Sequence, residues 1–98
     1  MTYIKNMKLD ELYEIIKKRR ETKPQGSYIV GLIDQGMDRI IQKVGEEAVE
    51  VVIAAKNSDK KRIISESADL LFHLIILLNI NNIELDDIYR ELDERNKK

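Results

Sequence analysis

Residues 43–73 place acidic side chains at helical spacing inside strongly apolar sequence, which constrains the fold more than any other feature. The acids concerned are Glu46, Glu47, Glu50, Glu66 and Asp69. Glu47/Glu50 and Glu66/Asp69 are both spaced i, i+3, so the members of each pair lie about 60° apart on one helix face. Acids this close in apolar surroundings repel one another, and loss of hydration adds to the penalty. We therefore expect a compensating cation, most simply a hard divalent metal ion.

Apolar residues recur at helical spacing along most of the chain, and no alternating β pattern persists. A loop with the only proline, at residues 21–27, and the breakers Gly36 and Asn57-Ser58-Asp59 separate the segments. Helices are predicted at 9–20, from the Ser27 cap to about 35, at 37–56, at about 60–79 and at about 86–95. The predicted fold class is all-α, with four to five helices in a single domain spanning residues 1–98.

Residues 70–78 are apolar on every side apart from His73. A helix of this kind is buried all round, which is hard to achieve within one chain of 98 residues. We expect one face of this helix to meet a second copy, so that a homodimer completes the helical bundle.

Composition excludes several classes of function. The net charge of −1 gives no basic surface for nucleic acid, and the absence of cysteine excludes disulfides and thiolate metal sites. Residues 1–13 lack the apolar core of a signal peptide, and the run at 70–78 is far shorter than the ~20 residues that span a bilayer. We expect a soluble, cytoplasmic protein that binds neither nucleic acid nor membrane.

The acids share their helix faces with two further polar residues. Lys43 projects on the side of Glu47 and Glu50, and His73 projects on the side of Glu66 and Asp69. If the two helices pack antiparallel across residues 57–59, both carboxylate pairs can face one point. Four carboxylates without cysteine suit Mg²⁺ or Mn²⁺, and such a cluster beside Lys43 and Lys56 suits phosphoanhydride chemistry.

Other interpretations stay open at this point. Charged positions at this spacing also form ordinary solvated helix faces, and a di-iron bundle is disfavoured because its Glu-x-x-His motif is missing. His73 is predicted to be a hydrogen-bonded core histidine or a second-shell group rather than a ligand. Gly45 is predicted to allow close helix packing, the alternative being room for a ligand beside the acids.

The strings KVGEEAVEVVIAAK (43–56) and ESADLLFHLIILL (66–78) closely resemble the phosphoribosyl-ATP pyrophosphohydrolase family. That family belongs to an all-α nucleoside triphosphate pyrophosphohydrolase superfamily, which includes MazG-like enzymes. The superfamily motif, E-E-x-x-E followed later by E-x-x-D, is similar to Glu46-Glu47-x-x-Glu50 and Glu66-x-x-Asp69. The resemblance runs from about Leu9 onward, with Phe72 standing where a tyrosine is expected.

The resemblance implies Mg²⁺-dependent hydrolysis of 1-(5-phosphoribosyl)-ATP to 1-(5-phosphoribosyl)-AMP and pyrophosphate, the second step of histidine biosynthesis. It implies a helical bundle completed by dimerisation. Lys43 and Lys56 become candidate phosphate contacts, and Glu46 becomes a second-shell group or the base for the attacking water. The implied metal ligands are Glu47, Glu50, Glu66 and Asp69.

Two other functions compete with this one. The first is a MazG-like enzyme that destroys non-standard nucleoside triphosphates, and the second is a non-catalytic helical dimer whose acids hold a structural ion. In some organisms the family domain is fused to the phosphoribosyl-AMP cyclohydrolase of the next step. This sequence shows no such domain, so we expect any partnership to join separate proteins.

Overall fold

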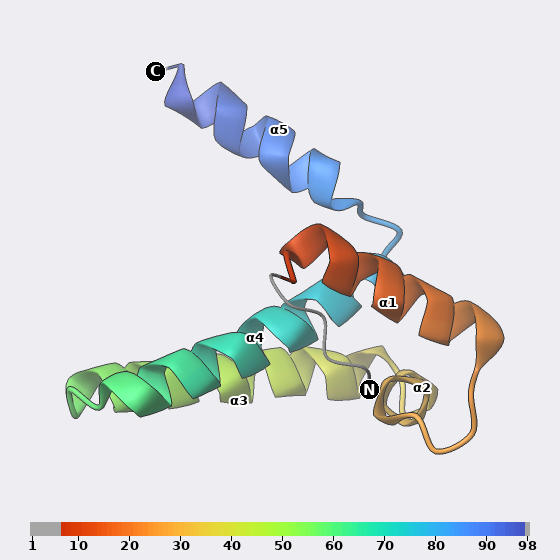
Figure 1. Cartoon of the computed structure of the whole chain (residues 1–98), viewed down its shortest axis with the longest axis horizontal. Coiled ribbons are helices and arrows are strands. Elements are labelled where there is room, and N and C mark those ends of the chain that lie inside the picture. The colour runs from red at the N-terminus through yellow and green to blue at the C-terminus, as the bar shows by residue number, and fades with distance from the viewer. Residues whose placement is uncertain (1–6, 98) are drawn as a thin grey trace.

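The computed structural model describes residues 7–97, which form helices and no strands. The helices are α1 (Leu9–Thr22), α2 (Tyr28–Asp34), α3 (Met37–Lys56), α4 (Lys60–Ile80) and α5 (Leu85–Asn96). The all-α prediction is confirmed, and α3 begins and ends at the predicted residues. Figure 1 shows α3 and α4 side by side as a long hairpin, with α1 and α2 gathered at one end of it.

Local chemistry explains where the helices begin. The Ser27 hydroxyl accepts a hydrogen bond from the Val30 N–H at 3.4 Å and starts α2. Asp59 does the same for the Arg62 N–H at 3.2 Å and starts α4. Gly36 precedes α3 with φ of +98°, a backbone conformation that favours glycine. These three positions therefore set the short connections that fold the chain back on itself.

The end of α4 lies slightly beyond its predicted place. Asn79 was expected to stop the helix, yet the helix continues to Ile80 and Asn79 is buried. The Arg20 guanidinium of α1 donates to the Asn79 main-chain oxygen at 2.9 Å and to its side-chain oxygen at 3.2 Å. Because these bonds satisfy the buried amide, α1 is anchored across α4 at this point.

One hydrophobic core joins the helices at the end of the hairpin that α1 and α2 cover. Its buried members are Tyr13, Ile16, Ile29, Leu32, Ile40, Ile75, Ile76 and Leu85. Towards the 57–59 turn the hairpin has only its own two helices, and Ala54 is the only described α3 residue buried beyond Ile40. The half of the hairpin that carries the acids is therefore formed by α3 and α4 alone.

The apolar run at residues 70–78 is only partly enclosed by its own chain. Ile75 and Ile76 are buried, whereas Leu71 keeps 40% of its surface exposed. The full burial expected of this run is therefore not reached within one chain. An additional apolar surface is needed to cover the remaining face.

Helix α4 is also long and apolar enough, by length and composition, to cross a membrane. Its packing indicates a different role. It lies against both α3 and α1, and it carries Glu66 and Asp69 together with a buried, hydrogen-bonded His73. Ionisable groups at such depth are expensive in lipid, whereas the core helix of a water-soluble bundle accommodates them at its polar edge.

No helix of the described residues packs closely against Gly45, so the predicted close packing there stays a prediction. A Cβ built on Gly45 meets no atom within 4 Å. Gly45 lies between the exposed Ile41 and Val49 along one helix face, and the buried Ile40 and Ala54 lie on the opposite face. The glycine therefore opens the outward side of α3 rather than its contact with α4.

Helix α5 projects away from the other helices (Figure 1). Its start is fixed by the buried Leu85, and farther along the Tyr89 hydroxyl donates to Asp10 of α1 at 2.9 Å. This hydrogen bond raises the pKa of Tyr89 because the carboxylate stabilises the neutral phenol. Ile88 and Leu92 remain exposed beside it, so α5 has an apolar face that its own chain leaves open.

Candidate metal-binding active site

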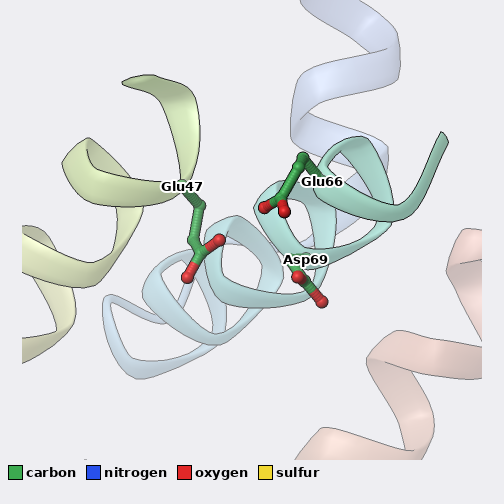
Figure 2. Close-up of side chains that lie close together, drawn as sticks. All are labelled: Glu47, Glu66 and Asp69. Atoms are coloured by element: carbon green, nitrogen blue, oxygen red, sulfur yellow. The ribbon is translucent and has the colours of Figure 1, made fainter. Parts of the chain in front are cut away.

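Three of the predicted metal ligands converge between α3 and α4. Oxygen atoms of Glu47, Glu66 and Asp69 all lie within 4.8 Å of one another. Figure 2 shows Glu47 reaching from α3 towards the two acids of α4. The side chains of Glu47 and Glu66 are mostly buried, with 13% and 19% of their surface exposed, whereas Asp69 is exposed. The antiparallel packing expected from the short turn therefore brings three of the four paired acids together.

Two cations lie among these acids. The Lys43 ammonium is 3.2 Å from Glu47, one turn away on α3. The Arg62 guanidinium is 3.3 Å from Glu50 and 3.7 Å from Glu66, so it links the two helices. Glu50, the fourth predicted ligand, is thus paired with Arg62 instead of joining the group of three. The repulsion expected between the acids is partly relieved by the chain's own cations.

Two other predicted site residues lie apart from this group. Glu46 is half exposed and pairs with Arg39 on its own helix at 3.4 Å. Lys56 is exposed on the last turn of α3 and makes no ion pair with an acid in the described range 7–97. Their roles as base and phosphate contact stay predictions.

The three converging carboxylates have the chemistry of a site for a hard divalent cation. Every donor is an oxygen, which favours Mg²⁺ or Mn²⁺ over zinc or copper. Octahedral Mg²⁺ at about 2.1 Å from its ligands needs oxygens roughly 3.0 to 4.2 Å apart. Since the carboxylate oxygens lie within 4.8 Å of one another, small rotations of these side chains would satisfy that geometry.

A hollow of about 450 Å³ lies elsewhere, between α1 and the start of α5, and Asp10 and Arg90 are among its lining residues. None of the converging carboxylates lines it. The acids instead lie between α3 and α4, where Asp69 is the exposed member of the group.

Comparison with known proteins identifies the family. Residues 9–96 match the family described as phosphoribosyl-ATP pyrophosphohydrolase. The chain belongs to this family. It is 45% identical over 94 residues to a phosphoribosyl-ATP pyrophosphatase of Clostridium acetobutylicum, covering 96% of this chain and 86% of that protein. A phosphoribosyl-ATP pyrophosphatase of Methanosarcina acetivorans is 46% identical over 92 residues, covering 92% of this chain and 88% of that protein.

A further relative is longer than this chain. The histidine biosynthesis bifunctional protein HisIE of Caldanaerobacter subterraneus subsp. tengcongensis is 52% identical over 90 residues, or 92% of this chain. The match covers 44% of that protein, so the chain spans less than half of it. This match therefore concerns only one part of the bifunctional protein.

In this member of the pyrophosphohydrolase family, His73 has partners on both ring nitrogens. Nδ1 lies 2.8 Å from the Asp69 main-chain oxygen, and Nε2 lies 2.8 Å from the Tyr28 hydroxyl. A carbonyl oxygen only accepts, so Nδ1 carries the hydrogen and Nε2 of the neutral ring accepts from Tyr28. His73 thereby joins α2 to the turn of α4 that presents Asp69, although its own side chain is not in the carboxylate group.

Tyr28 adds packing to this hydrogen bond. Its ring stacks on Phe72 at 6.1 Å between centroids, and His73 meets both rings edge-on. Phe72 was noted as a departure from the expected tyrosine, and here it contributes ring packing that needs no hydroxyl. The two aromatic residues and His73 form a brace that holds α2 against α4 beside Asp69.

Sequence reasoning missed three residues of this region. Tyr28, Arg62 and Arg39 were given no role in the site by the sequence pattern. The spacing i, i+4 between Arg62 and Glu66 was a usable signal for one of them. The link from Tyr28 to His73 joins residues 45 positions apart, so no local pattern could have revealed it.

Substituting Tyr28→Phe removes the hydroxyl and keeps the ring that stacks on Phe72. We expect the free energy of unfolding to fall by about 1 kcal/mol, because the buried His73 nitrogen loses its donor. Chemical denaturation of the wild type and the variant measures this difference. Tyr89→Phe is the matched control, since its hydroxyl bonds to the exposed Asp10, and it should lose less stability. Equal stability of Tyr28→Phe and the wild type would contradict the brace.

Proposed function

We propose that this chain hydrolyses 1-(5-phosphoribosyl)-ATP to 1-(5-phosphoribosyl)-AMP and pyrophosphate, the second step of histidine biosynthesis. The observation that carries the proposal is the family match over residues 9–96. The convergence of Glu47, Glu66 and Asp69 supports it, because this reaction needs the negative charge of adjacent phosphates to be neutralised. The substrate is assigned from the family and its named relatives.

The proposal includes Mg²⁺, or Mn²⁺, as the cofactor. Glu47, Glu66 and Asp69 would hold it, and Glu50 is the fourth candidate if its pair with Arg62 opens. Bound there, the ion would neutralise phosphate oxygens and polarise the anhydride. The position of the proposed ion follows from the positions of these acids. Their helices, α3 and α4, are both held in the hydrophobic core at one end.

The remaining residues have roles that follow from their positions. Lys43 is 3.2 Å from Glu47 and mostly buried, so it holds that carboxylate in place and supplies positive charge beside the phosphates. Glu46, once released from Arg39, is the candidate base for the attacking water. The brace of Tyr28 and His73 orients the α4 turn that carries Asp69. Lys56 remains a candidate phosphate contact at the rim.

We also propose that the chain works as a homodimer. Exposed apolar residues form a stripe at helical spacing along the outward face of α3, with Gly45 in its middle. Its members are Ile41, Val49 and Val52. Leu71 and Ile64 of α4 are exposed as well. Two hairpins pairing through these residues would make a four-helix bundle.

The longer relative supports a functional link. A protein named as bifunctional in histidine biosynthesis contains a segment matching this chain. We propose that the product passes to a phosphoribosyl-AMP cyclohydrolase and that both reactions take place in the cytoplasm. The packing of α4 against α1 and α3 supports a water-soluble fold of this kind.

Purified protein with Mg²⁺ should release pyrophosphate from phosphoribosyl-ATP and not from dATP, dUTP or dCTP. Asp69→Asn and Glu50→Gln should each lower kcat at least about a hundredfold, because a metal ion contributes several kcal/mol to such a reaction. The same assay on Asp93→Asn, an exposed acid of α5, controls for loss of one charge. Thermal stability of Asp69→Asn should stay equal or rise, since a like charge is removed, and that of Glu50→Gln should change little, since its pair with Arg62 is exposed.

This assay separates the competing functions. Release from the simple triphosphates would indicate a MazG-like activity instead. Release from no substrate would favour a non-catalytic dimer. Near-normal turnover by Asp69→Asn at low Mg²⁺ would show that the proposed metal site is wrong.

The dimer has its own test in Val52→Glu. A carboxylate within the apolar stripe should shift the sedimentation mass from about twice 11.5 kDa to that of one chain. The helix itself should survive, because the new acid lies four residues before Lys56. Lys18→Glu, on the exposed face of α1, is the charge control and should leave the mass unchanged. A wild-type mass near 11.5 kDa at micromolar concentration would rule out the dimer.

A further inference from the structure

Arg62 occupies a special place among the acids of this site. Its Nη2 atom lies 3.3 Å from the Glu50 Oε2 atom on α3 and 3.7 Å from the Glu66 Oε1 atom on its own helix. A single nitrogen therefore lies near two carboxylates, one on each helix of the hairpin. An ordinary i, i+4 pair along a helix would involve only Glu66.

The ion pair between Arg62 and Glu50 is weakly held. The Arg62 and Glu50 side chains are 46% and 45% exposed, and exposed ion pairs of this kind add little to stability. Glu66 also belongs to the group of three carboxylates that suits a divalent cation. Arg62 and such a cation therefore compete for the same carboxylate, and the ion with two charges has the advantage.

The main chain of Arg62 is fixed, whereas its side chain has room to move. The main-chain N–H is fixed by the Asp59 cap at 3.2 Å, whereas the long side chain is half exposed at the edge of the acids. The first turn of α4 carries Lys60, Lys61 and Arg62 and no acid. Cations at this end oppose the helix dipole. Of these three cations, only Arg62 lies against the carboxylates, so its guanidinium is the positive group placed to meet a phosphate bound there.

We propose that Arg62 is an exchangeable counter-ion that becomes a phosphate ligand. While it pairs with Glu50 and Glu66 it neutralises their charge, and when a divalent cation takes those oxygens its guanidinium turns to the phosphate oxygens of the substrate. A planar guanidinium binds phosphate through two parallel hydrogen bonds, which lysine cannot do. This role deepens the proposed pyrophosphohydrolase function and rests on it for the identity of the substrate.

The first test measures the binding of Mn²⁺ alone by titration calorimetry. Arg62→Ala should bind Mn²⁺ about fivefold more tightly than the wild type, because the competing cation is gone. Lys61→Ala removes the same charge from the neighbouring position and is the matched control. Its effect should be under about twofold, since Lys61 makes no ion pair within residues 7–97 and its charge is screened. Equal effects of the two variants on Mn²⁺ affinity would overturn the proposal that the metal ion displaces Arg62 from the carboxylates.

The second test measures inorganic pyrophosphate binding in the presence of Mn²⁺. Arg62→Ala should bind it about tenfold more weakly than Lys61→Ala does, and Arg62→Lys should fall between Arg62→Ala and the wild type. A merely structural Arg62 would change thermal stability and leave both affinities alone. Pyrophosphate affinities that match in the two alanine variants would refute the phosphate contact.

Turnover of phosphoribosyl-ATP then separates the two proposals. If the wild type turns over and Arg62→Ala shows the KM of Lys61→Ala, Arg62 is not a phosphate ligand and the proposed function stands. If the wild type does not turn over while the Mn²⁺ and pyrophosphate affinities shift as expected, the exchange stands and the proposed substrate is wrong.

Discussion

The antiparallel packing of α3 against α4 brings carboxylates from two helices to within 4.8 Å of one another, and most features of the site follow from it. Acids held this way repel, so the packing survives only if positive charge enters between the helices. Lys43 and Arg62 supply part of that charge, one from each helix. The four acids Glu47, Glu50, Glu66 and Asp69 still outnumber them by two. The net negative charge that remains favours binding of a cation.

The helices that flank the hairpin explain how this arrangement keeps its shape. At one end, Arg20 of α1 donates to Asn79, and Tyr28 of α2 donates to His73. Both bonds end on polar groups buried in α4, where an unpaired nitrogen or oxygen would be costly. The His73 bond lies one turn from Asp69, so the register of α4 at the site is held from outside the hairpin.

Much of the fold was readable from the sequence, and the reasons are local. The apolar spacing, the Ser27 and Asp59 caps and the glycine at residue 36 all act over a few positions, so the helices follow from them. The convergence of Glu47, Glu66 and Asp69 was predictable because a three-residue turn forces the helices antiparallel. The pairing of Glu50 with Arg62 was not, since several cations lie within reach and only packing chooses among them. The environment of Gly45 within one chain was not readable, because a glycine fits an open helix face as well as a tight interface.

Helix α4 must meet three demands at once, and this explains its unusual composition. It fills the core through Ile75 and Ile76, it carries the acids of the site, and it leaves Leu71 uncovered. Apolar residues on all sides make it look like a membrane segment by composition, yet the acids Glu66 and Asp69 lie on one face only. A second copy covering the remaining apolar face would satisfy all three demands. The site and the proposed dimer are thus two consequences of the same helix.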